Sequence, residues 1–172
     1  MRALLASLAI AFLAPGPAAA QAPPAPGAFT PFEATWSARG QRQVLRLGAR
    51  TATTVSLSGA FSVASGQGLS KGYRGEALGF DDGAGDARAL LTLTDDKGDQ
   101  IFADIKGETV ASGRKWVGKI TGGTGRYAGI EGDFSFAWQF VVQDEDGGFQ
   151  GRAVDFRGRY RRGAAEAPGT RP

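Results

Sequence analysis

Apolar and polar residues alternate along most of the chain, which is the two-residue period of a half-buried β-strand. The clearest example lies in the stretch ITGGTGRYAGIEGDFSFAWQF, which begins at Ile120 with a glycine-dense bend. After this bend, one strand face collects Phe134, Phe136, Trp138, Phe140 and Val142. The opposite face is mostly polar, so the pattern predicts an antiparallel strand with one buried side.

Short runs of this kind recur, separated by turns rich in Gly and Asp. They predict strands near residues 32–38, 42–47, 51–57, 61–64, 71–80, 87–94, 100–109, 115–121, 133–143 and 149–160. Outside residues 1–20, only a single turn at 125–129 is a candidate for helix. The 27 glycines also disfavour helix, because each costs about 1 kcal/mol relative to alanine there. The pattern therefore predicts an all-β fold, either a closed antiparallel barrel or a sandwich.

The N-terminus has the three parts of a secretory signal peptide: Arg2, an apolar run from Ala3 to Ala14, and small residues ending at Ala20. We expect cleavage near Ala20 and export to the periplasm or the extracellular space. A retained membrane anchor is less consistent with the sequence, because prolines interrupt the segment too early. Residues 21–29 are predicted to be a Pro/Ala linker, 30–162 the barrel domain and 163–172 a flexible tail. With no cysteine, this domain must be stabilised by packing alone.

The charge balance argues against nucleic acid as a partner. The 20 Lys and Arg residues nearly match the 17 Asp and Glu residues, so no broad basic surface is expected. The one basic cluster contains Arg157, Arg159 and Arg161, which share a strand face opposite Phe156 and Tyr160. This spacing is typical of a solvated face. No later segment is long and apolar enough to span a bilayer as a helix.

Three acidic turns, at residues 81–86, 95–99 and 144–148, are the strongest metal candidates in the sequence. Their carboxylates could contribute to a calcium site, but the closing Glu of an EF-hand is missing from each. Asp and Gly are also the residues that tight hairpins require, so we interpret these segments as turns. Because His and Cys are absent, the usual zinc and copper sites and the Ser-His-Asp triad are excluded. No metal and no cofactor are predicted.

Four ionisable residues lie within predicted strands, and they are the candidates for catalysis: Glu76, Asp104, Glu108 and Arg152. A carboxylate that points into an apolar barrel would have a raised pKa and could act as an acid or a base. The alternative is that these side chains face solvent, as Asp104 and Glu108 would if Ile101 and Ile105 face inward.

The aromatic residues allow two interpretations. They could line a cavity for a small apolar ligand, with Phe102, Trp116, Phe136 and Trp138 as the candidates for its wall. They could equally fill the core, because an eight-stranded barrel is just wide enough for either arrangement. The sequence leaves both open.

Two blocks together carry a resemblance to a known family. TDDKGDQIFADIKGE (residues 94–108) and ITGGTGRYAGIEGDFSF (residues 120–136) resemble exported bacterial proteins of the allene-oxide-cyclase-like barrel superfamily, which includes the plant dirigent proteins. The resemblance covers residues 69–160. It implies an eight-stranded antiparallel barrel of calycin-like form with a small hydrophobic cavity. The plant members act by shape and electrostatics without metal or organic cofactor, but none of their functional residues could be matched onto this chain.

These observations give three hypotheses of function. The first is an exported barrel that binds a small apolar molecule. The second is a cofactor-free isomerase or cyclase that uses Glu76, Asp104 or Glu108, which requires at least one of them to point inward. The third is a structural or interaction protein of the cell envelope that assembles as a homo-oligomer.

Overall fold

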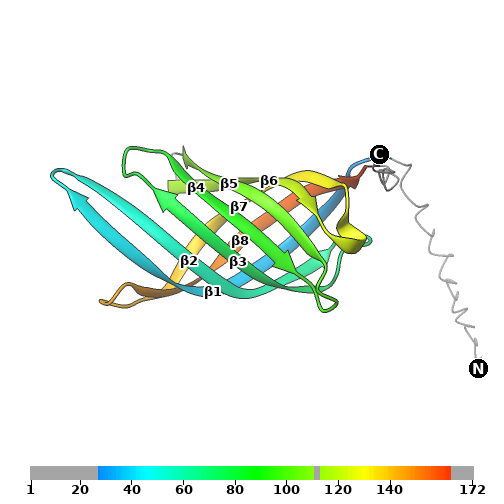
Figure 1. The fold of residues 1–172 in the computed structure, drawn as a ribbon, viewed down its shortest axis with the longest axis horizontal. Helices are drawn as coiled ribbons and strands as arrows, with labels where there is room; N and C mark the ends of the chain where they lie inside the picture. Colours follow the sequence, from blue (N-terminus) through cyan, green and yellow to red (C-terminus); the bar gives the residue numbers. More distant parts are fainter. Residues whose placement is uncertain (1–26, 111–112, 164–172) are drawn as a thin grey trace, which may run out of the picture.

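Eight antiparallel strands form a closed barrel in which each strand pairs with the next and β8 returns to pair with β1 (Figure 1). This computed structural model describes residues 27–110 and 113–163. The strands are β1 (Thr30–Leu47), β2 (Arg50–Ser65), β3 (Gly72–Asp81), β4 (Ala87–Thr94), β5 (Gln100–Val110), β6 (Gly113–Gly123), β7 (Ile130–Gln143) and β8 (Gly148–Arg162). The all-β class and the closed barrel predicted from the sequence are confirmed.

A single turn of 3-10 helix, η1 (Gly125–Tyr127), is the only helix in the described part of the chain, and it lies within the turn predicted at 125–129. No helix among these residues is long and apolar enough to cross a membrane. The predicted signal peptide at 1–20, the linker up to residue 26 and the tail from residue 164 lie outside the described residues.

The prediction of ten strands was wrong at two places, where pairs of predicted strands are one continuous strand. Gly40 in β1 and Gly59 in β2 were interpreted as breaks, yet both stay in the sheet. They mark close approach between neighbouring strands. A Cβ atom on Gly40 would lie 1.8 Å from the Ser56 carbonyl oxygen, and one on Gly59 would lie 2.0 Å from that of Ser37. Glycine inside a strand can mark such a contact as well as a turn.

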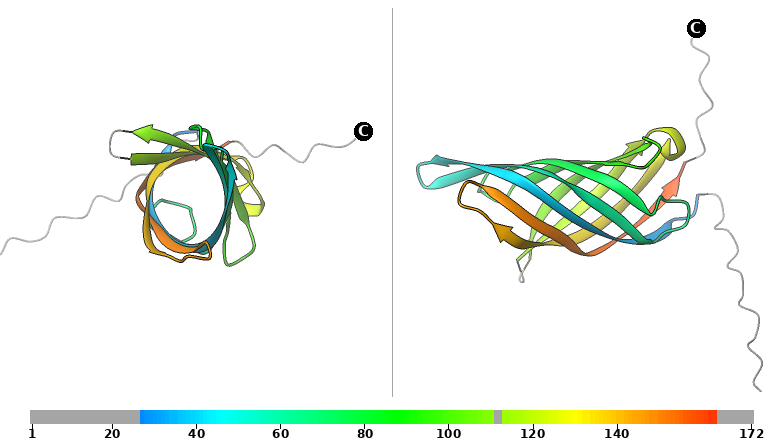
Figure 2. Two further views of the ribbon diagram at one scale, coloured as in Figure 1. Left: turned by 90° about the vertical axis from the view of Figure 1, so that its left-hand side faces the viewer. Right: turned by 90° about the horizontal axis from the view of Figure 1, so that it is seen from below.

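The barrel has one closed end, at which the loop between β2 and β3 folds across the lumen. This loop lies within the ring of strands in the left panel of Figure 2. Backbone groups of the loop are held by side chains of other elements: Tyr160 Oη donates to the Gln67 carbonyl oxygen, and Arg162 donates to that of Gly68 at 2.7 Å. The Ser70 amide donates to Tyr73 Oη at 2.8 Å. Among the described residues, no loop covers the opposite end of the barrel.

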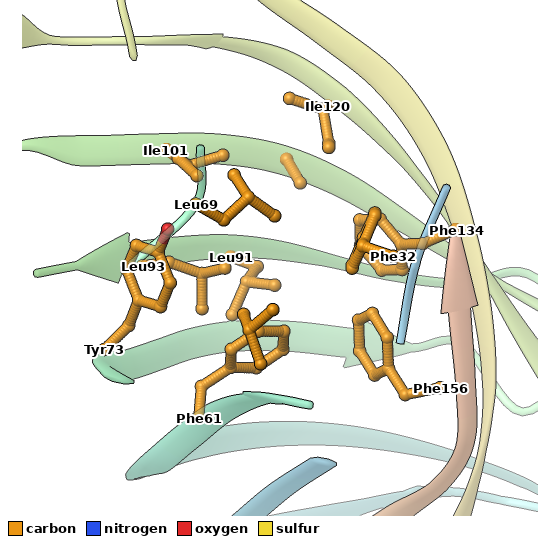
Figure 3. A pocket seen from close by; sticks show the side chains of 12 residues that line it. Phe32, Phe61, Leu69, Tyr73, Leu91, Leu93, Ile101, Ile120, Phe134 and Phe156 are labelled. Atoms are coloured by element: carbon orange, nitrogen blue, oxygen red, sulfur yellow. The ribbon is translucent and has the colours of Figure 1, made fainter. Parts of the chain in front are cut away.

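The half of the interior next to the closed end is filled by aromatic and aliphatic side chains (Figure 3). Phe156 is at the centre of this packing, with ring centroids 4.9 Å from Phe134, 5.1 Å from Phe61 and 5.2 Å from Phe136. Only about 20 Å³ of space remains among these side chains, little more than one water molecule needs.

A β-bulge in β8 turns Phe156 toward the interior. The pairing of β8 with both neighbours shifts register next to Asp155, which has a φ of 52°. Aspartate tolerates this left-handed conformation better than most residues. Because the bulge adds one residue, Ala153 and Phe156 are both buried although three positions separate them.

The basic cluster of β8 lies on the solvated outer face, as the sequence predicted. Arg157 lies 3.5 Å from Glu33, Arg159 lies 2.9 Å from Asp133, and Arg161 lies 2.7 Å from Glu131. These arginines are each paired with a neighbouring strand and exposed to water, so they add little to stability.

Glycine is required beneath one aromatic ring, which gives a test of the packing. A Cβ atom on Gly118 of β6 would lie 2.0 Å from Cζ of Phe134, whose ring is fixed by the Phe156 cluster. We predict that Gly118→Ala lowers the free energy of unfolding by about 1–3 kcal/mol, the usual cost of overpacking a core. Urea denaturation measures the change.

Gly72→Ala is the matched control, because a Cβ atom there has nothing within 4 Å. It should leave stability within about 0.5 kcal/mol of the parent. Equal effects of the two substitutions would contradict the packing described for Phe134.

Candidate functional site

The open half of the barrel contains a cavity of about 430 Å³. This volume lies within the range of about 300–1,000 Å³ that is typical of small-molecule sites. Its lining is mainly apolar and comes from all eight strands: Trp36, Arg42, Thr53, Val55, Leu57, Ala77, Gly79, Phe80, Asp81, Arg88, Ala89, Ile105, Trp116, Phe136, Trp138, Phe140 and Phe149. One half of the interior is therefore filled by side chains and the other half holds the cavity. Phe136, at the edge of the Phe156 cluster, lies at the boundary between the two halves.

All three tryptophans of the chain line this cavity. Trp116 stacks on Phe136 with the ring planes 14° apart, and Trp36 meets Trp138 edge to face at 5.7 Å. Trp138 also contacts Phe149 at 6.5 Å, so the rings support one another around the wall. Such contacts restrict the rings and give the cavity a preformed shape.

Trp36 is almost fully buried, and its Nε1 has no hydrogen-bond partner among the described residues. A Cβ atom on Gly75 would lie only 2.8 Å from this nitrogen, so the absence of a side chain at Gly75 makes room for the indole. An unsatisfied buried donor costs roughly 1–3 kcal/mol. The barrel therefore keeps Trp36 in the wall at an energetic cost.

Polar groups are confined to the rim of the cavity. Arg42 donates to Gln143 Oε1 at 3.1 Å and forms no ion pair with any described carboxylate. Arg88 is paired with Asp86 at 2.5 Å, and Asp81 Oδ1 accepts a hydrogen bond from the Gly83 amide at 2.9 Å. The deeper part of the cavity therefore offers aromatic and aliphatic contacts, while charge is available only at the mouth.

Three of the four residues proposed for the cavity wall are placed there. Trp116, Phe136 and Trp138 line the cavity, but Phe102 does not. The prediction for Phe102 was wrong because it alternates with buried Ile101 and Ala103, so its side chain lies on the outer face of β5. Strand parity could have shown this, since Phe102 has the same parity as the polar residues of its strand.

None of the four proposed catalytic residues reaches the interior. Glu76, Asp104, Glu108 and Arg152 are all exposed on the outside of the barrel. Glu76 is bonded to Arg74 at 2.6 Å, and Arg152 donates to Gln139 Oε1 at 3.2 Å. The alternative interpretation, in which these side chains face solvent, is the one that the structure supports. The carboxylates at these positions keep their contact with water and lack the burial inside the barrel that the catalytic hypothesis required.

Sequence reasoning missed several residues of the cavity. Trp36 and Phe149 belong to strands whose period was clear, but nothing in their own pattern separates a lining residue from a core residue. Arg42 was missed because its strand was interpreted as separate from the run that contains Trp36. The continuous two-residue period from Trp36 through Gly40 to Arg42 is the signal that could have placed it on the inner face.

A second polar cluster stabilises the closed end, away from the cavity. The Asp95 side chain is fully buried and accepts hydrogen bonds from Arg126 and from the backbone amides of Lys97 and Asp99. Arg126 also lies over the ring of Tyr127, at 5.0 Å from its centroid. Burial opposes ionisation of Asp95, but these hydrogen bonds outweigh it and hold its pKa below the usual value.

At the same end of the barrel, the pKa values of three tyrosines are raised, whereas that of Asp95 is lowered. Burial, together with the hydrogen bond to Tyr127, raises the pKa of Tyr73, and burial raises the pKa of Tyr127 and Tyr160. Tyr73 Oη donates to Tyr127 Oη at 2.9 Å. These hydroxyls therefore stay protonated, and their role in the described structure is to hold the loop that closes the barrel.

The carboxylates of the acidic segments stabilise tight turns, as the sequence predicted, and are not arranged as metal ligands. Asp82 Oδ1 accepts from the amides of Ala84 at 2.7 Å and Asp86 at 3.1 Å, and Asp95 Oδ1 does the same in its own turn. Within the described ranges, no group of three or more acidic residues is arranged to hold a metal ion. Of the glycines in the segment 122–125, Gly122 still belongs to β6, and Gly125 lies in the bend between β6 and β7 with a φ of 52°.

No family model, curated protein or solved structure matches this chain. The resemblance to the allene-oxide-cyclase-like superfamily therefore stays a prediction, and the barrel itself is what the structure adds to it.

The buried Asp95 gives a testable dependence of stability on pH. Because its folded pKa is lowered, its contribution is present above the unfolded value of about 3.9 and is lost as the pH falls through the folded value. We predict that Asp95→Asn costs roughly 2–4 kcal/mol at neutral pH, somewhat less than breaking a fully buried pair, because Arg126 is partly exposed. Denaturation across the acid range should show this cost shrinking below about pH 4.

Asp96→Asn is the control, since Asp96 is exposed and only 3.7 Å from the same arginine. It should change stability by less than about 0.5 kcal/mol at any pH. A pH-independent cost of Asp95→Asn would contradict the assigned ion pair.

Proposed function

We propose that this protein is an exported binding protein that holds a small apolar molecule in the open half of its barrel. The observation that carries the proposal is the 430 Å³ cavity with its aromatic lining. A solid interior would have removed the hypothesis, and half of this interior is open. Export rests on the N-terminal sequence pattern alone.

The chemistry of the lining supports an apolar ligand. Trp36, Trp116, Phe136, Trp138 and Phe149 contribute broad ring surfaces, and burial of apolar area on such surfaces gives about 25 cal/mol per Å² before the costs of binding. Polar groups at the rim can contact one end of a bound molecule without entering the apolar part. The arrangement suits a molecule with a hydrophobic body and one end that remains near water.

The isomerase or cyclase hypothesis has less support. It required Glu76, Asp104 or Glu108 to point inward, and all three are exposed. The ionisable groups that line the cavity, Arg42, Asp81 and Arg88, lie at its mouth, where water competes with any acid–base role. Binding is the function that the cavity favours.

Ligand titration tests the proposal directly, because every tryptophan of the protein lies in the cavity wall. We expect a panel of terpenoids and fatty alcohols to include molecules that change the tryptophan fluorescence saturably with 1:1 stoichiometry. Val55→Phe, which adds a ring inside the cavity, should weaken this binding about tenfold or more by removing space for the ligand.

The neighbouring substitution Thr54→Phe is the control, because Thr54 is exposed on the outer face of the same strand. It should leave affinity within about twofold, since ordinary strand alternation turns it away from the cavity. If no member of the panel binds, or if both substitutions act equally, the cavity is not a binding site for such molecules.

A further inference from the structure

The β1–β2 hairpin extends beyond the rest of the open end (Figure 1). Pairing of β1 with β8 stops at Gln41, and the last backbone contact is from the Arg42 amide to the Gly147 carbonyl oxygen at 2.9 Å. Pairing of β2 with β3 begins only at Thr53. Residues 43–52 therefore form a two-stranded ribbon with no strand beside it, which we call the hairpin tip. At about 3.3 Å per residue, it reaches roughly 15 Å past the neighbouring hairpin of β7 and β8.

The hairpin tip combines exposed apolar residues with positive charge. Val44 is 54% exposed and Leu45 is 61% exposed, and because they are consecutive they point to opposite sides of the ribbon. Arg46 is exposed and makes no ion pair with any described residue. Arg50 donates to the Asp82 carbonyl oxygen at 3.4 Å, and its guanidinium lies 3.9 Å from the Asp82 carboxylate. No Asp or Glu occurs anywhere between residues 34 and 75.

We infer that the hairpin tip inserts into the surface of an anionic lipid bilayer. An apolar tip flanked by arginines matches such a surface in both respects: the apolar side chains enter the acyl boundary and the cations meet the headgroup phosphates. A ribbon that is apolar on both sides is suited to end-on insertion, whereas a hairpin that lies flat on a surface would be apolar on one side only.

Acidic residues of two turns lie at the base of the hairpin tip. In the turn between β3 and β4, Asp86 is paired with Arg88 at 2.5 Å, and Asp82 lies 3.9 Å from Arg50. The turn between β7 and β8 carries Asp144, Glu145 and Asp146 and lies beside Arg42, whose amide donates to the Gly147 carbonyl oxygen. Arg46 lies four residues farther along the ribbon, about 13 Å at about 3.3 Å per residue, which exceeds the screening length of about 10 Å at moderate salt. Further exposed apolar side chains lie beside the mouth, among them Phe140, Val141 and Val142 on β7 and Phe80 on β3. Approach through the tip therefore brings the mouth of the cavity toward the lipid.

This inference rests on the proposed function and extends it by naming a lipid bilayer as the source of the ligand. The inner side of the hairpin is continuous with the cavity wall, because Arg42, Thr53 and Val55 belong to both. An apolar molecule that leaves a bilayer at the tip would thus pass to the cavity along β1 and β2 without crossing bulk water, where its solubility is low.

Vesicle co-sedimentation of the mature protein tests the contact. We expect binding to vesicles of equal parts phosphatidylcholine and phosphatidylglycerol, weaker binding to phosphatidylcholine alone, and loss of the difference at high salt. Leu45→Ser and Arg46→Glu should each reduce binding to the anionic vesicles about tenfold. Neither should alter tryptophan-detected affinity for a ligand in solution, since neither residue lines the cavity.

Leu90→Ser and Arg157→Glu are matched controls. Leu90 is 65% exposed on the barrel wall, and Arg157 is an exposed arginine of β8, so they repeat the change in hydropathy or charge away from the tip. Equal effects of tip and wall substitutions, or no preference for anionic vesicles, would overturn the inference.

A dimer in light scattering that Leu45→Ser dissociates would also overturn it, by assigning the tip to a second copy of the chain. Failure of ligand binding in solution, with vesicle binding intact, would instead refute the proposed function and leave the lipid contact standing.

Discussion

The cluster of rings around Phe156 determines what the rest of the barrel can do. An eight-stranded barrel encloses only enough space for its own side chains or for one small ligand. Here Phe32, Phe61, Phe134 and Phe136 surround Phe156 and use the space next to the closed end, where their packing stabilises the barrel without disulfides. Because this cluster supplies the core packing, the side chains of the open half need not fill the lumen, and its tryptophans can line a cavity. The bulge at Asp155 is essential to this division, because it turns Phe156 inward.

The closed end is built from the two blocks of sequence that carry the family resemblance. Asp95 and Asp99 lie in the first block, and Arg126 and Tyr127 in the second, and they contact one another directly. Gly125 fits against Asp99 because a side chain there would collide with its carboxylate. The most distinctive motifs of this chain thus serve architecture. A sequence resemblance based on these motifs therefore concerns the closed end of the barrel and gives no information about a ligand in the cavity.

The sequence predicted the fold well because its signal is local: strand alternation and turn residues specify β3 and β4 almost to the residue. It placed Trp116, Phe136 and Trp138 on inner faces for the same reason. It failed at Gly40 and Gly59, where a glycine that permits close contact has the same appearance as one that permits a turn. It could not say that the cavity lies in one half, because this depends on which inward rings meet across the barrel. Neither the extension of the hairpin tip nor the position of Arg42 at the rim follows from any single strand.

The loop between β2 and β3, which lies across the lumen, also blocks passage of a small molecule through that end of the barrel. Leu69 lies among the rings of the filled half, and three tyrosines hold the backbone around it, so the described residues leave no passage through this end. Anything that enters must depart by the way it came. A barrel closed at one end in this way has the form of a cup, and under the proposed function a ligand would both enter and leave between the hairpins of the open rim.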